Sequence, residues 1–403
     1  MSGTTNTLVE ISDYLYKKNP EGANEIINKL ETKYKQHIDE LFATPEYKQK
    51  GLEIIKSHFD YIRSYTKDLF TLFEEKVVLA QGELISTAMV NFYLQECGVK
   101  SVLLPALEFM RTDKNAEPDP IYIKEKLLAQ LELYPDADIY ITQGFICRNA
   151  YGEIDNLQRG GSDYTASLIG AAINASEIQI WTDIDGMHNN DPRIVDKTAP
   201  VRQLHFEEAA ELAYFGAKIL HPTCIQPAKY ANIPVRLLNT MDPEAPGTLI
   251  SNDTEKGKIK AVAAKDNITA IKIKSSRMLL AHGFLRKVFE IFESYQTSID
   301  MICTSEVGVS VTVDNTKHLN EILDDLKKYG TVTVDKEMCI ICVVGDLEWE
   351  NVGFEAKALD AMRDIPVRMI SFGGSNYNIS FLIRECDKKV ALQSLSDMLF
   401  NGK

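Results

Sequence analysis

Residues 159–166 read Arg-Gly-Gly-Ser-Asp-Tyr-Thr-Ala, and this segment constrains the fold more than any other part of the chain. The β-branched run at 139–142 before it predicts a strand. After it, an Ala- and Ile-rich stretch predicts a helix over 163–174, and residues 177–181 predict a second strand. A glycine pair between a strand and a helix, followed by another strand, is typical of an α/β unit.

The same turn has the composition of an anion-binding site. Its glycine pair allows backbone N–H groups to approach a ligand, and the dipole of the following helix favours negative charge there. Ser162 is a natural N-cap, and the planar cation of Arg159 suits a carboxylate or a phosphate. A Gly-Gly pair alone would indicate an ordinary βα turn, but its combination with Arg, Ser and Asp favours an anion site.

The chain changes its periodicity near residue 76. Before that point, from about 7 to 73, apolar residues recur at helical spacing, with breaks near Asn19-Pro20 and Thr44-Pro45. From there on, strands and helices are expected to alternate: a strand at 76–80, a helix at 84–96, a strand at 99–104, and further elements within 139–181, 207–217 and 235–238. We therefore predict an α/β sandwich with a largely parallel sheet, whose ligand sites lie at the carboxyl ends of its strands.

The last third of the chain contains two small units of similar order. A polar stretch at 248–266 is a plausible linker before them. The first unit, 269–334, and the second, 338–399, each show the order strand, helix, two strands, helix that is typical of a βαββαβ module. Cys339 and Cys342 belong to a buried-strand pattern in the second unit. We predict an internal duplication of α+β modules.

Bulk properties restrict the class of protein. The chain has 403 residues, enough for two or three domains, and its net charge of −14 disfavours nucleic acid or an anionic membrane as a partner. Seven scattered cysteines without zinc spacing predict reduced thiols. No apolar run reaches the length that spans a bilayer by this reading, so we expect a soluble, cytoplasmic protein.

Polar clusters follow several predicted strands and together favour a nucleotide-dependent site. Glu83 follows the expected strand at 76–80, and Thr-Asp-Ile-Asp-Gly at 182–186 follows the expected strand at 177–181. Asn-Asp-Pro-Arg at 190–193 comes after it, and Lys218 lies at the expected end of a helix. Each cluster alone would indicate an ordinary turn or helix end. P-loop, zinc-protease and Rossmann motifs are absent, which disfavours these three classes of protein. The seven histidines have no metal-ligand spacing, which leaves Mg²⁺ as the expected metal.

Five segments together resemble the aspartate kinase family of the amino-acid-kinase fold: 143–145, 159–163, 181–183, 190–193 and 215–222. Residues 1–6 resemble that family's Thr-Asn turn, and the two terminal modules resemble its paired ACT domains. The resemblance implies an α/β fold: an amino-acid-kinase-like α/β/α sandwich, N-terminally incomplete, over 1–255. Two ACT-type α+β modules follow, over 256–335 and 336–403, and the second may include the strand at 258–264.

The resemblance implies transfer of the ATP γ-phosphoryl group to the β-carboxylate of L-aspartate, the first step of lysine, threonine and methionine biosynthesis. Catalytic roles are implied for Lys218 and Asp183. The residues implied to hold aspartate are Thr5, Glu83, Phe145, Arg159, Gly161, Ser162 and Asp163. The residues implied to hold ATP are Thr182, Asp183, His188, Arg193 and Lys218, and the family often has Tyr where His188 stands.

The front of the chain departs from the family. Members carry a first strand with Lys-Phe-Gly-Gly-Thr-Ser, whose Lys and Gly residues bind phosphates, and this chain has no such segment. We therefore expect the 403-residue chain to be weakly active or inactive.

The ACT portion resembles the lysine-inhibited class, and the resemblance implies L-lysine as an inhibitor. Asp300 and Glu306 would pair with ammonium groups, and the backbone before Phe284 with the carboxylate. The implied lysine-binding residues are Met278, Gly283, Phe284, Leu285, Ser298, Ile299, Asp300, Ser305 and Glu306. ACT modules commonly pair between subunits, so a homodimer is implied.

Two other functions remain open at this level. The first is a non-catalytic, ACT-type amino-acid-binding regulatory subunit, which the missing phosphate segment supports and the retained Arg159, Asp163, Asp183 and Lys218 oppose. The second is an amino-acid kinase acting on glutamate or a derivative, which fits the ACT pair poorly. Threonine inhibition is also compatible, because few contacts decide the ligand of an ACT module.

Overall fold

The computed structural model describes residues 3–67, 69–157, 160–216, 221–275 and 282–401. The chain divides into two compact units. Unit 1 contains Met1–Ile178 and Thr223–Ile233, and unit 2 contains Gln179–Pro222 and Pro234–Lys403. The predicted sites Arg159, Lys218 and Met278 lie outside the described residues.

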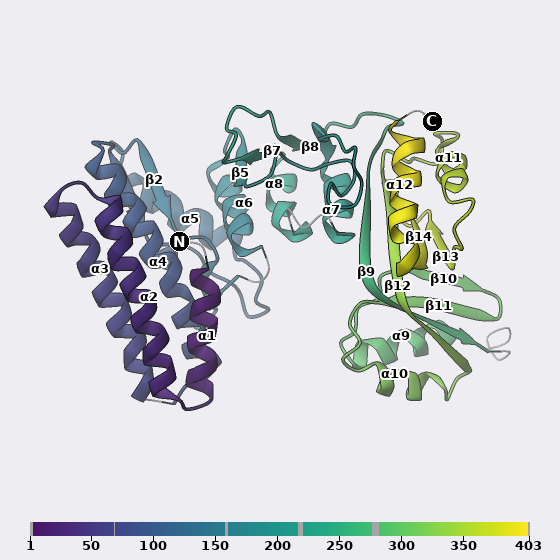
Figure 1. Cartoon of the computed structure of the whole chain (residues 1–403), viewed down its shortest axis with the longest axis horizontal. Coiled ribbons are helices and arrows are strands. Elements are labelled where there is room, and N and C mark those ends of the chain that lie inside the picture. Colours follow the sequence, from purple (N-terminus) through teal and green to yellow (C-terminus); the bar gives the residue numbers. More distant parts are fainter. Residues whose placement is uncertain (1–2, 68, 158–159, 217–220, 276–281, 402–403) are drawn as a thin grey trace. The chain divides into compact units, whose positions relative to one another are not determined.

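Unit 1 begins with four helices that pack side by side (Figure 1). They are α1 (Thr4–Tyr16), α2 (Pro20–Leu41), α3 (Pro45–Ser64) and α4 (Leu72–Glu96). The predicted breaks at Asn19-Pro20 and Thr44-Pro45 are confirmed, because a proline stands at the first position of both α2 and α3. Asn19 caps α2 by accepting a hydrogen bond from the backbone N–H of Gly22 at 3.0 Å.

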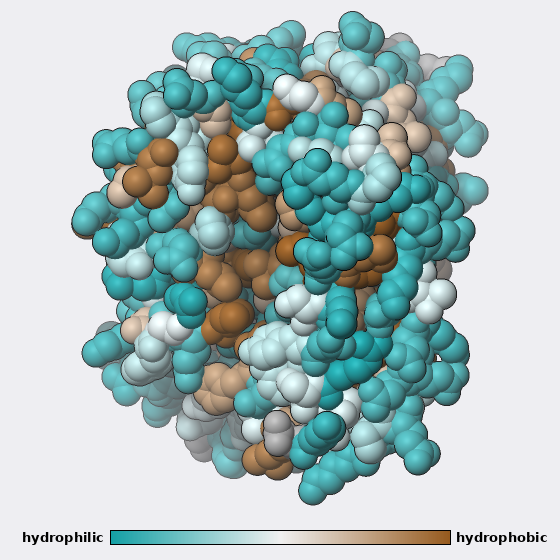
Figure 2. All heavy atoms as spheres, turned by 90° about the vertical axis from the view of Figure 1, so that its left-hand side faces the viewer, coloured by the Kyte–Doolittle hydropathy of each residue, from teal (hydrophilic) through white to brown (hydrophobic). Residues whose placement is uncertain are grey.

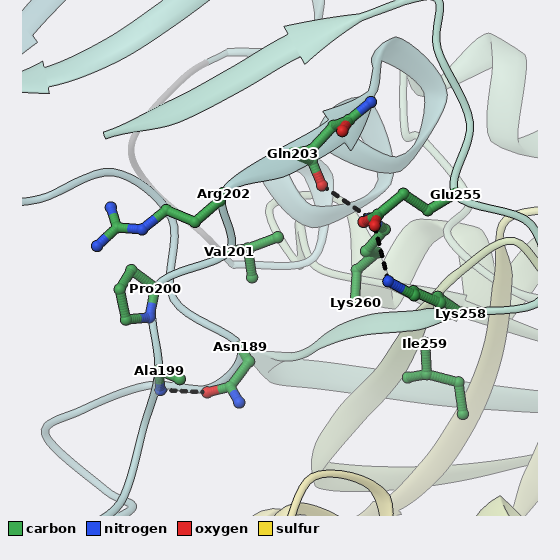
Figure 3. A pocket seen from close by; sticks show the side chains of 10 residues that line it. All are labelled: Asn189, Ala199, Pro200, Val201, Arg202, Gln203, Glu255, Lys258, Ile259 and Lys260. Carbon is green, nitrogen blue, oxygen red and sulfur yellow. Dashed lines mark hydrogen bonds and ion pairs between the residues drawn. The ribbon is translucent and has the colours of Figure 1, made fainter. Parts of the chain in front are cut away.

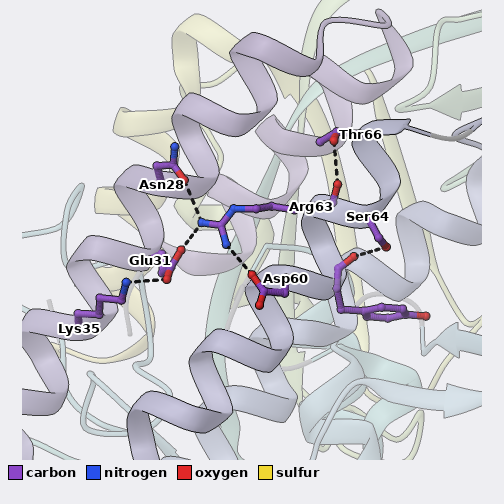
Figure 4. Close-up of polar contacts among 8 residues, drawn as sticks. Asn28, Glu31, Lys35, Asp60, Arg63, Ser64 and Thr66 are labelled. Carbon is purple, nitrogen blue, oxygen red and sulfur yellow. Dashed lines mark hydrogen bonds and ion pairs between the residues drawn. The ribbon is translucent and has the colours of Figure 1, made fainter.

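The helices bury one apolar core, and Arg63 joins α3 to α2 at its border (Figure 4). Its guanidinium donates to Asn28 at 2.9 Å and to Asp60 at 3.1 Å, and it forms an ion pair with Glu31. The largest fully buried side chains of this core are Leu8, Ile11, Ile27, Tyr34, Ile38, Phe42, Ile55 and Phe59.

The strand predicted at 76–80 is wrong, because these residues lie inside α4. The helix starts at a capping box in which Thr71 and Glu74 satisfy each other's backbone N–H groups. The expectation that no apolar run could span a bilayer is also corrected, since α4 is long and apolar enough by length and composition. In unit 1, Val78, Ile85 and Met89 of α4 are buried in the helical core.

Short strands and helices complete unit 1. The strands β1 (Ser101–Leu104) and β2 (Ile139–Thr142) pair in parallel, which confirms both predicted strands. The strands β3 (Ile146–Arg148) and β4 (Ile154–Asn156) form an antiparallel pair. The helices are α5 (Pro120–Glu132), α6 (Gly161–Ile173) and α8 (Gln226–Tyr230).

Unit 1 exposes several large apolar side chains. Figure 2 shows the face that lies on the left of Figure 1, and apolar residues gather in the middle of this face. The most exposed large apolar side chains of unit 1 are Leu69, Leu72, Phe73, Ile121, Leu133, Tyr151 and Tyr230. Single exposed apolar residues are common, whereas contiguous patches more often mark contact surfaces.

Unit 2 opens with a four-stranded sheet of order β5-β7-β8-β6 among the described residues. Its strands are β5 (Ile178–Thr182), β7 (Val235–Asn239), β8 (Thr248–Ser251) and β6 (Gln203–His205), and α7 (Phe206–Tyr214) follows β6. β6 and β8 are parallel, but β7 and β8 are antiparallel. The prediction of one largely parallel sheet is therefore wrong for the described strands, which form mixed and separate sheets.

The predicted linker at 248–266 is shorter than expected. Its first residues form β8, where the buried Thr248 donates to the carbonyl of Val201 at 2.6 Å and accepts from the N–H of Met187 at 2.9 Å. Its last residues begin β9 (Ile259–Lys274). Only 252–258 lie outside strands.

Over its described residues, the rest of unit 2 is a six-stranded antiparallel sheet with four helices (Figure 1). Its order is β10-β11-β9-β12-β14-β13 among the described residues. The further strands are β10 (Ile302–Ser305), β11 (Gly308–Val313), β12 (Thr331–Gly345), β13 (Met369–Phe372) and β14 (Asn378–Arg384). The helices are α9 (Phe284–Ser294), α10 (Leu319–Leu326), α11 (Phe354–Ala361) and α12 (Lys388–Leu399).

Two long strands belong to both halves of this sheet. The end of β9 pairs with β11 and with the start of β12, whereas its beginning pairs with the end of β12. The register shifts between Asp335 and Met338, where Asn267 and Glu337 have φ values of 60° and 55°. The strands predicted at 332–334 and 338–344 are thus one strand, and Cys339 and Cys342 are buried in it.

Candidate functional site

The glycine-rich turn of unit 1 packs directly against the loop that follows β2. A Cβ atom added at Gly161 would lie 2.7 Å from Cδ2 of Phe145, and one added at Gly144 would lie 2.9 Å from Oγ of Ser162. The two segments can approach each other this closely only because glycine stands at both positions. The N-cap of α6 is Gly160, with φ 73°, and no side chain caps this helix. The prediction of Ser162 as the N-cap is therefore wrong: it is exposed in the first turn.

Phe145 is fixed to α6 through its backbone. Its N–H donates to Oγ1 of Thr165 at 3.1 Å, and its carbonyl accepts from the N–H of Leu157 at 2.7 Å. Its φ of 69° is unusual for a residue with a side chain. The hydrogen bonds hold this conformation, so the loop has a defined geometry beside the first turn of α6.

Glu83 lies in the middle of α4, not at a strand end as predicted. A hydrogen-bonded chain connects this turn of α4 to the loop after β2. Oγ1 of Thr87 donates to the carbonyl of Glu83 at 2.8 Å, and Nε2 of Gln143 donates to Oγ1 of Thr87 at 2.9 Å. Gln143, which is 1% exposed, also accepts from the N–H of Ala106 at 2.8 Å. Gln143 precedes Gly144 and Phe145, so Glu83 belongs to the same neighbourhood.

Two carboxyl groups of this neighbourhood are half-buried. Burial raises the pKa of Glu83 and also the pKa of Asp163 in the first turn of α6. Neither forms an ion pair with a described residue. A cationic ligand would stabilise the charged forms of both carboxyl groups.

Thr5 lies in the first helical turn of α1, not in the Thr-Asn loop turn that the family resemblance implies, and it is exposed. Its neighbour Thr4 is buried and shares a hydrogen bond of 3.1 Å with the hydroxyl of Tyr34. A Cβ atom added at Gly82 would lie 3.2 Å from Cγ2 of Thr4, so the start of α1 contacts α4 next to Glu83. Unit 1 therefore brings together Thr5, Glu83, Phe145, Gly161, Ser162 and Asp163 as one set of neighbouring segments.

The residues predicted to hold ATP lie in unit 2. Thr182 ends β5, and its Oγ1 accepts from the N–H of Ile184 at 3.1 Å. This bond turns the chain and leaves Asp183 exposed. His188 is half-buried, and its Nδ1 lies 3.0 Å from Oγ1 of Thr198.

Arg193 already has an acidic partner. Its Nε and one terminal nitrogen donate to the two carboxylate oxygens of Asp191, at 2.9 and 2.7 Å. The bidentate pair lowers the pKa of Asp191 and raises that of Arg193. The side chain of Arg193 is 81% exposed, so this pair is accessible to a polyanion.

A cavity of about 320 Å³ in unit 2 does not contain the predicted residues (Figure 3). Lys258 and Lys260 both pair with Glu255, and Lys260 also donates to the carbonyl of Gln203 at 3.0 Å. Hydrogen bonds from Lys258 and Lys260 lower the pKa of Glu255 to about 2. Both lysines thus share one carboxylate, and Arg202 in the same lining pairs with Asp185. Its lining residues are Asn189, Ala199, Pro200, Val201, Arg202, Gln203, Glu255, Lys258, Ile259 and Lys260.

The predicted lysine-binding residues divide into two groups. Gly283 is the N-cap of α9 with φ 85°, and Phe284, Leu285 and Ile299 pack in or against the core of the first module. Asp300 precedes β10, whereas Ser305 and Glu306 stand at the opposite end of β10, in the turn to β11. At about 3.3 Å per residue, this strand separates Asp300 from Ser305 by roughly 17 Å. The structure thus does not bring Asp300 and Glu306 together within one chain; Ser298 is exposed.

The positioning residues Gln143, Thr87 and Tyr34 were missed as site residues. These residues form hydrogen bonds with backbone and side-chain atoms of segments that are distant in sequence. Composition and spacing do not reveal such contacts. The capping box at 71–74 was the local signal that α4 begins before residue 76.

Comparison with known proteins gives a consistent result. Residues 12–239 match the amino acid kinase family, and residues 341–399 match an ACT domain. Aspartokinase 1, chloroplastic, of Arabidopsis thaliana is 34% identical over 424 residues, which cover 100% of this chain and 74% of that protein.

Two solved structures resemble the whole chain. E. coli aspartokinase III in complex with aspartate and ADP has a TM-score of 0.82 and 31% identity, and the match covers 99% of this chain and 91% of that one. The same enzyme in complex with lysine and aspartate has a TM-score of 0.79 at 31% identity, with the same coverage. These matches confirm the predicted kinase fold followed by ACT modules, and the chain therefore belongs to the aspartokinases of the amino acid kinase family.

Proposed function

We propose that this aspartate kinase transfers the γ-phosphoryl group of MgATP to the β-carboxylate of L-aspartate, giving 4-phospho-L-aspartate. This would be the first step of lysine, threonine and methionine biosynthesis. The observation that carries the substrate assignment is the pair of half-buried carboxyl groups, Glu83 and Asp163, on segments that meet at the 143–145 loop. An ammonium group is the ligand that such carboxyl groups favour.

The reaction needs positioning more than proton transfer. A carboxylate is already a nucleophile at neutral pH, so no general base is required, and alignment with charge neutralisation supplies most of the rate. We assign Glu83 and Asp163 to the ammonium side of aspartate, with Thr5, Phe145, Gly161 and Ser162 beside them. Arg159, outside the described residues, is assigned to the α-carboxylate.

On the nucleotide side, we assign Thr182, Asp183, His188 and Arg193 to ATP, together with Lys218, which lies outside the described residues. Asp183 and Lys218 are assigned the catalytic roles. Exposure of Asp183 and of the Arg193 pair supports this, because both are accessible to phosphates.

Mg²⁺ is proposed to arrive with ATP. No group of three or more His, Cys, Asp or Glu side chains converges among the described residues as a preformed metal site would. A magnesium ion held by phosphates and one carboxylate fits this arrangement, with Asp183 as the exposed carboxylate. When bound, the ion would neutralise charge on the phosphates.

Regulation by L-lysine is proposed from the ACT modules and from the lysine complex of the E. coli relative. A homodimer through the ACT modules and a cytoplasmic location are proposed with it. The support for this location is the scattered spacing of the seven cysteines, which are free in the structure. Light scattering during size-exclusion chromatography would measure the mass and test the dimer.

The substrate is tested by calorimetric titration with L-aspartate and by a coupled assay for ADP release. We expect Asp163→Asn and Glu83→Gln to weaken aspartate binding at least tenfold, because charged hydrogen bonds and ion pairs of this kind are worth about 1.5–3 kcal/mol. Asp136→Asn, at an exposed position, is the control. Equal use of L-glutamate and L-aspartate would contradict the proposed substrate.

A further inference from the structure

Asp300 is held by two residues from outside the loop that carries it. Nζ of Lys265, in β9, lies 2.7 Å from its Oδ1, and the hydroxyl of Tyr214, the last residue of α7, donates to the same oxygen at 2.8 Å. Lys265 also pairs with Asp314 at 2.9 Å. The ammonium of Lys265 lies 4.3 Å from the centroid of the Tyr214 ring, within reach of a cation–π interaction.

This cluster is largely protected from water. The side chain of Asp300 is 1% exposed and that of Lys265 is 18% exposed. Oδ2 of Asp300 is buried and has no hydrogen-bond partner among the described residues. A buried carboxylate needs a cation close by, and here the chain itself supplies one.

A second contact fixes the end of α7 next to Lys265. Gly216 has φ 125°, and a Cβ atom added there would lie 2.2 Å from the carbonyl oxygen of Ala264, the residue before Lys265. The segment 215–222, to which a nucleotide contact is assigned above, starts at this point. Tyr214 and Gly216 therefore connect the end of α7, where that segment begins, to the part of β9 that neutralises Asp300.

We propose that Lys265 occupies the position beside Asp300 that the ammonium group of an effector would take. Tyr214 is a positioning residue for the nucleotide-binding segment. The side-chain ammonium of L-lysine is chemically the same group as that of Lys265. An effector that reaches Asp300 must displace Lys265 and compete with Tyr214 for the same oxygen. Freed from Asp300, Tyr214 no longer holds the end of α7.

The electrostatics of the cluster agree with this. Burial, followed by the hydrogen bond to Asp300, raises the pKa of Tyr214 to about 12, so its hydroxyl stays a donor at neutral pH. Burial alone would lower the pKa of Lys265, but hydrogen bonds to Asp300 and Asp314 hold it above its ordinary value. Lys265 is thus charged in the state that the structure shows.

The effector competition is tested by calorimetric titration of L-lysine into the whole chain and its variants. Only the fraction of molecules in which Lys265 has left Asp300 is competent to bind, so Lys265→Met is expected to lower the lysine dissociation constant about tenfold. Lys265→Arg keeps the internal cation and is expected to restore weaker binding. Lys388→Met is the matched control, since Lys388 pairs with the adjacent Asp266 at 2.6 Å and has a similar exposure of 22%.

The positioning role is tested by MgADP titration, without lysine. Tyr214→Phe removes the hydroxyl but keeps the ring, and it is expected to weaken MgADP binding about threefold and to remove the effect of lysine on that binding. Tyr295→Phe also removes a hydroxyl that donates to a carboxylate, that of Asp325, and serves as control.

The outcomes separate this inference from the proposed function on which it rests. A wild-type chain that binds MgADP but no lysine refutes the proposed effector, and the two tyrosine variants then decide the role of Tyr214 alone. If lysine binds, the proposed competition is overturned by either of two results. One is an equal lysine affinity of the wild-type chain and Lys265→Met, and the other is a gain in lysine affinity in Lys388→Met as large as that in Lys265→Met. Unchanged MgADP binding in Tyr214→Phe overturns the positioning role. Differential scanning calorimetry verifies that each variant is folded.

Discussion

Nε2 of Gln143 donates a 2.9 Å hydrogen bond to Oγ1 of Thr87, and the two side chains connect the loop after β2 to α4. Thr87 uses the same hydroxyl to donate to the backbone carbonyl of Glu83. The position of a proposed substrate-binding carboxylate thus depends on a buried amide 60 residues along the chain from it, counting from Glu83 to Gln143.

We expect Thr87→Val to raise the KM or dissociation constant for aspartate about threefold to tenfold, because a lost neutral hydrogen bond is worth about 0.5–1.5 kcal/mol. Thr87→Ser keeps the hydroxyl and should bind aspartate like the wild-type chain. A purely structural role for Thr87 would instead lower the thermal midpoint without a selective change in aspartate affinity. Calorimetry with aspartate and thermal unfolding distinguish the two.

Aspartate affinity should depend on pH through Glu83. Because burial raises the pKa of this carboxyl group, it takes up a proton at a higher pH than an ordinary glutamate. The neutral form cannot pair with an ammonium, so affinity should fall as the pH is lowered through the raised pKa. In Glu83→Gln, aspartate binding should be weak and this part of the pH dependence should be lost. An unchanged pH profile in that variant would contradict the assignment.

Arg63 should stabilise unit 1 measurably. Its side chain is 28% exposed and that of Glu31 is 11% exposed, so Arg63→Met leaves a largely buried carboxylate with one cationic partner, Lys35 (Figure 4). We expect a loss of about 2 kcal/mol, between the values typical of exposed and buried ion pairs. Arg286→Met, which breaks an exposed pair with Glu290, should cost less than about 0.5 kcal/mol.

The cost of Arg63→Met should also depend on pH. Burial alone would raise the pKa of Glu31, but hydrogen bonds from Lys35 and Arg63 hold it below its ordinary value. A lowered carboxyl pKa gives stability that is present above the unfolded pKa and is lost as the pH falls through the folded one. Urea unfolding at pH 7 and near pH 3 should therefore show a smaller difference between the two proteins at the lower pH.

The contribution of Glu208 to stability should depend on pH in the opposite direction from that of Glu31. It is 0% exposed, its Oε2 accepts from the N–H of His205 at 2.7 Å, and burial raises its pKa. A raised carboxyl pKa gives stability that is present at low pH and is lost as the pH rises through the folded value. Glu208→Gln keeps the capping box and should raise the thermal midpoint at pH 8 by a few degrees, but not at pH 4. A lower midpoint at pH 8 would refute this.

The sequence was sufficient where local chemistry decides the structure. Prolines at the first positions of α2 and α3 mark both helix starts, and the strand and helix order of the ACT modules follows from alternation and amphipathic spacing. The helix after the glycine-rich turn was also predicted, as α6, but the pair of β3 and β4 between β2 and this turn was not. In each case, residues within a few positions of one another determine the outcome.

The sequence was insufficient where tertiary contacts determine the structure. The helix predicted at 84–96 is the second half of α4. Residues 76–80 have the composition of a strand, and apolar residues lie all around α4, so only the capping box shows that the helix begins before residue 76. Glu83 was consequently assigned to a strand end. Gln143 joins segments that are distant in sequence, and local pattern does not contain such a contact. The boundary expected between 335 and 336 falls within β12.

The long strands β9 and β12 restrict how the two ACT modules can move. Successive side chains of a strand point to opposite faces, so a slip of one residue in either half would turn the core-facing residues of that strand outward in the other half as well. The pairing of β9 with β12 departs from regularity between Asp335 and Met338, between Met338 and Ile340, and between Val344 and Gly345. A slip of one strand past the other is therefore costly, and we expect this sheet to respond to a ligand by a change of twist or bend at these irregular points.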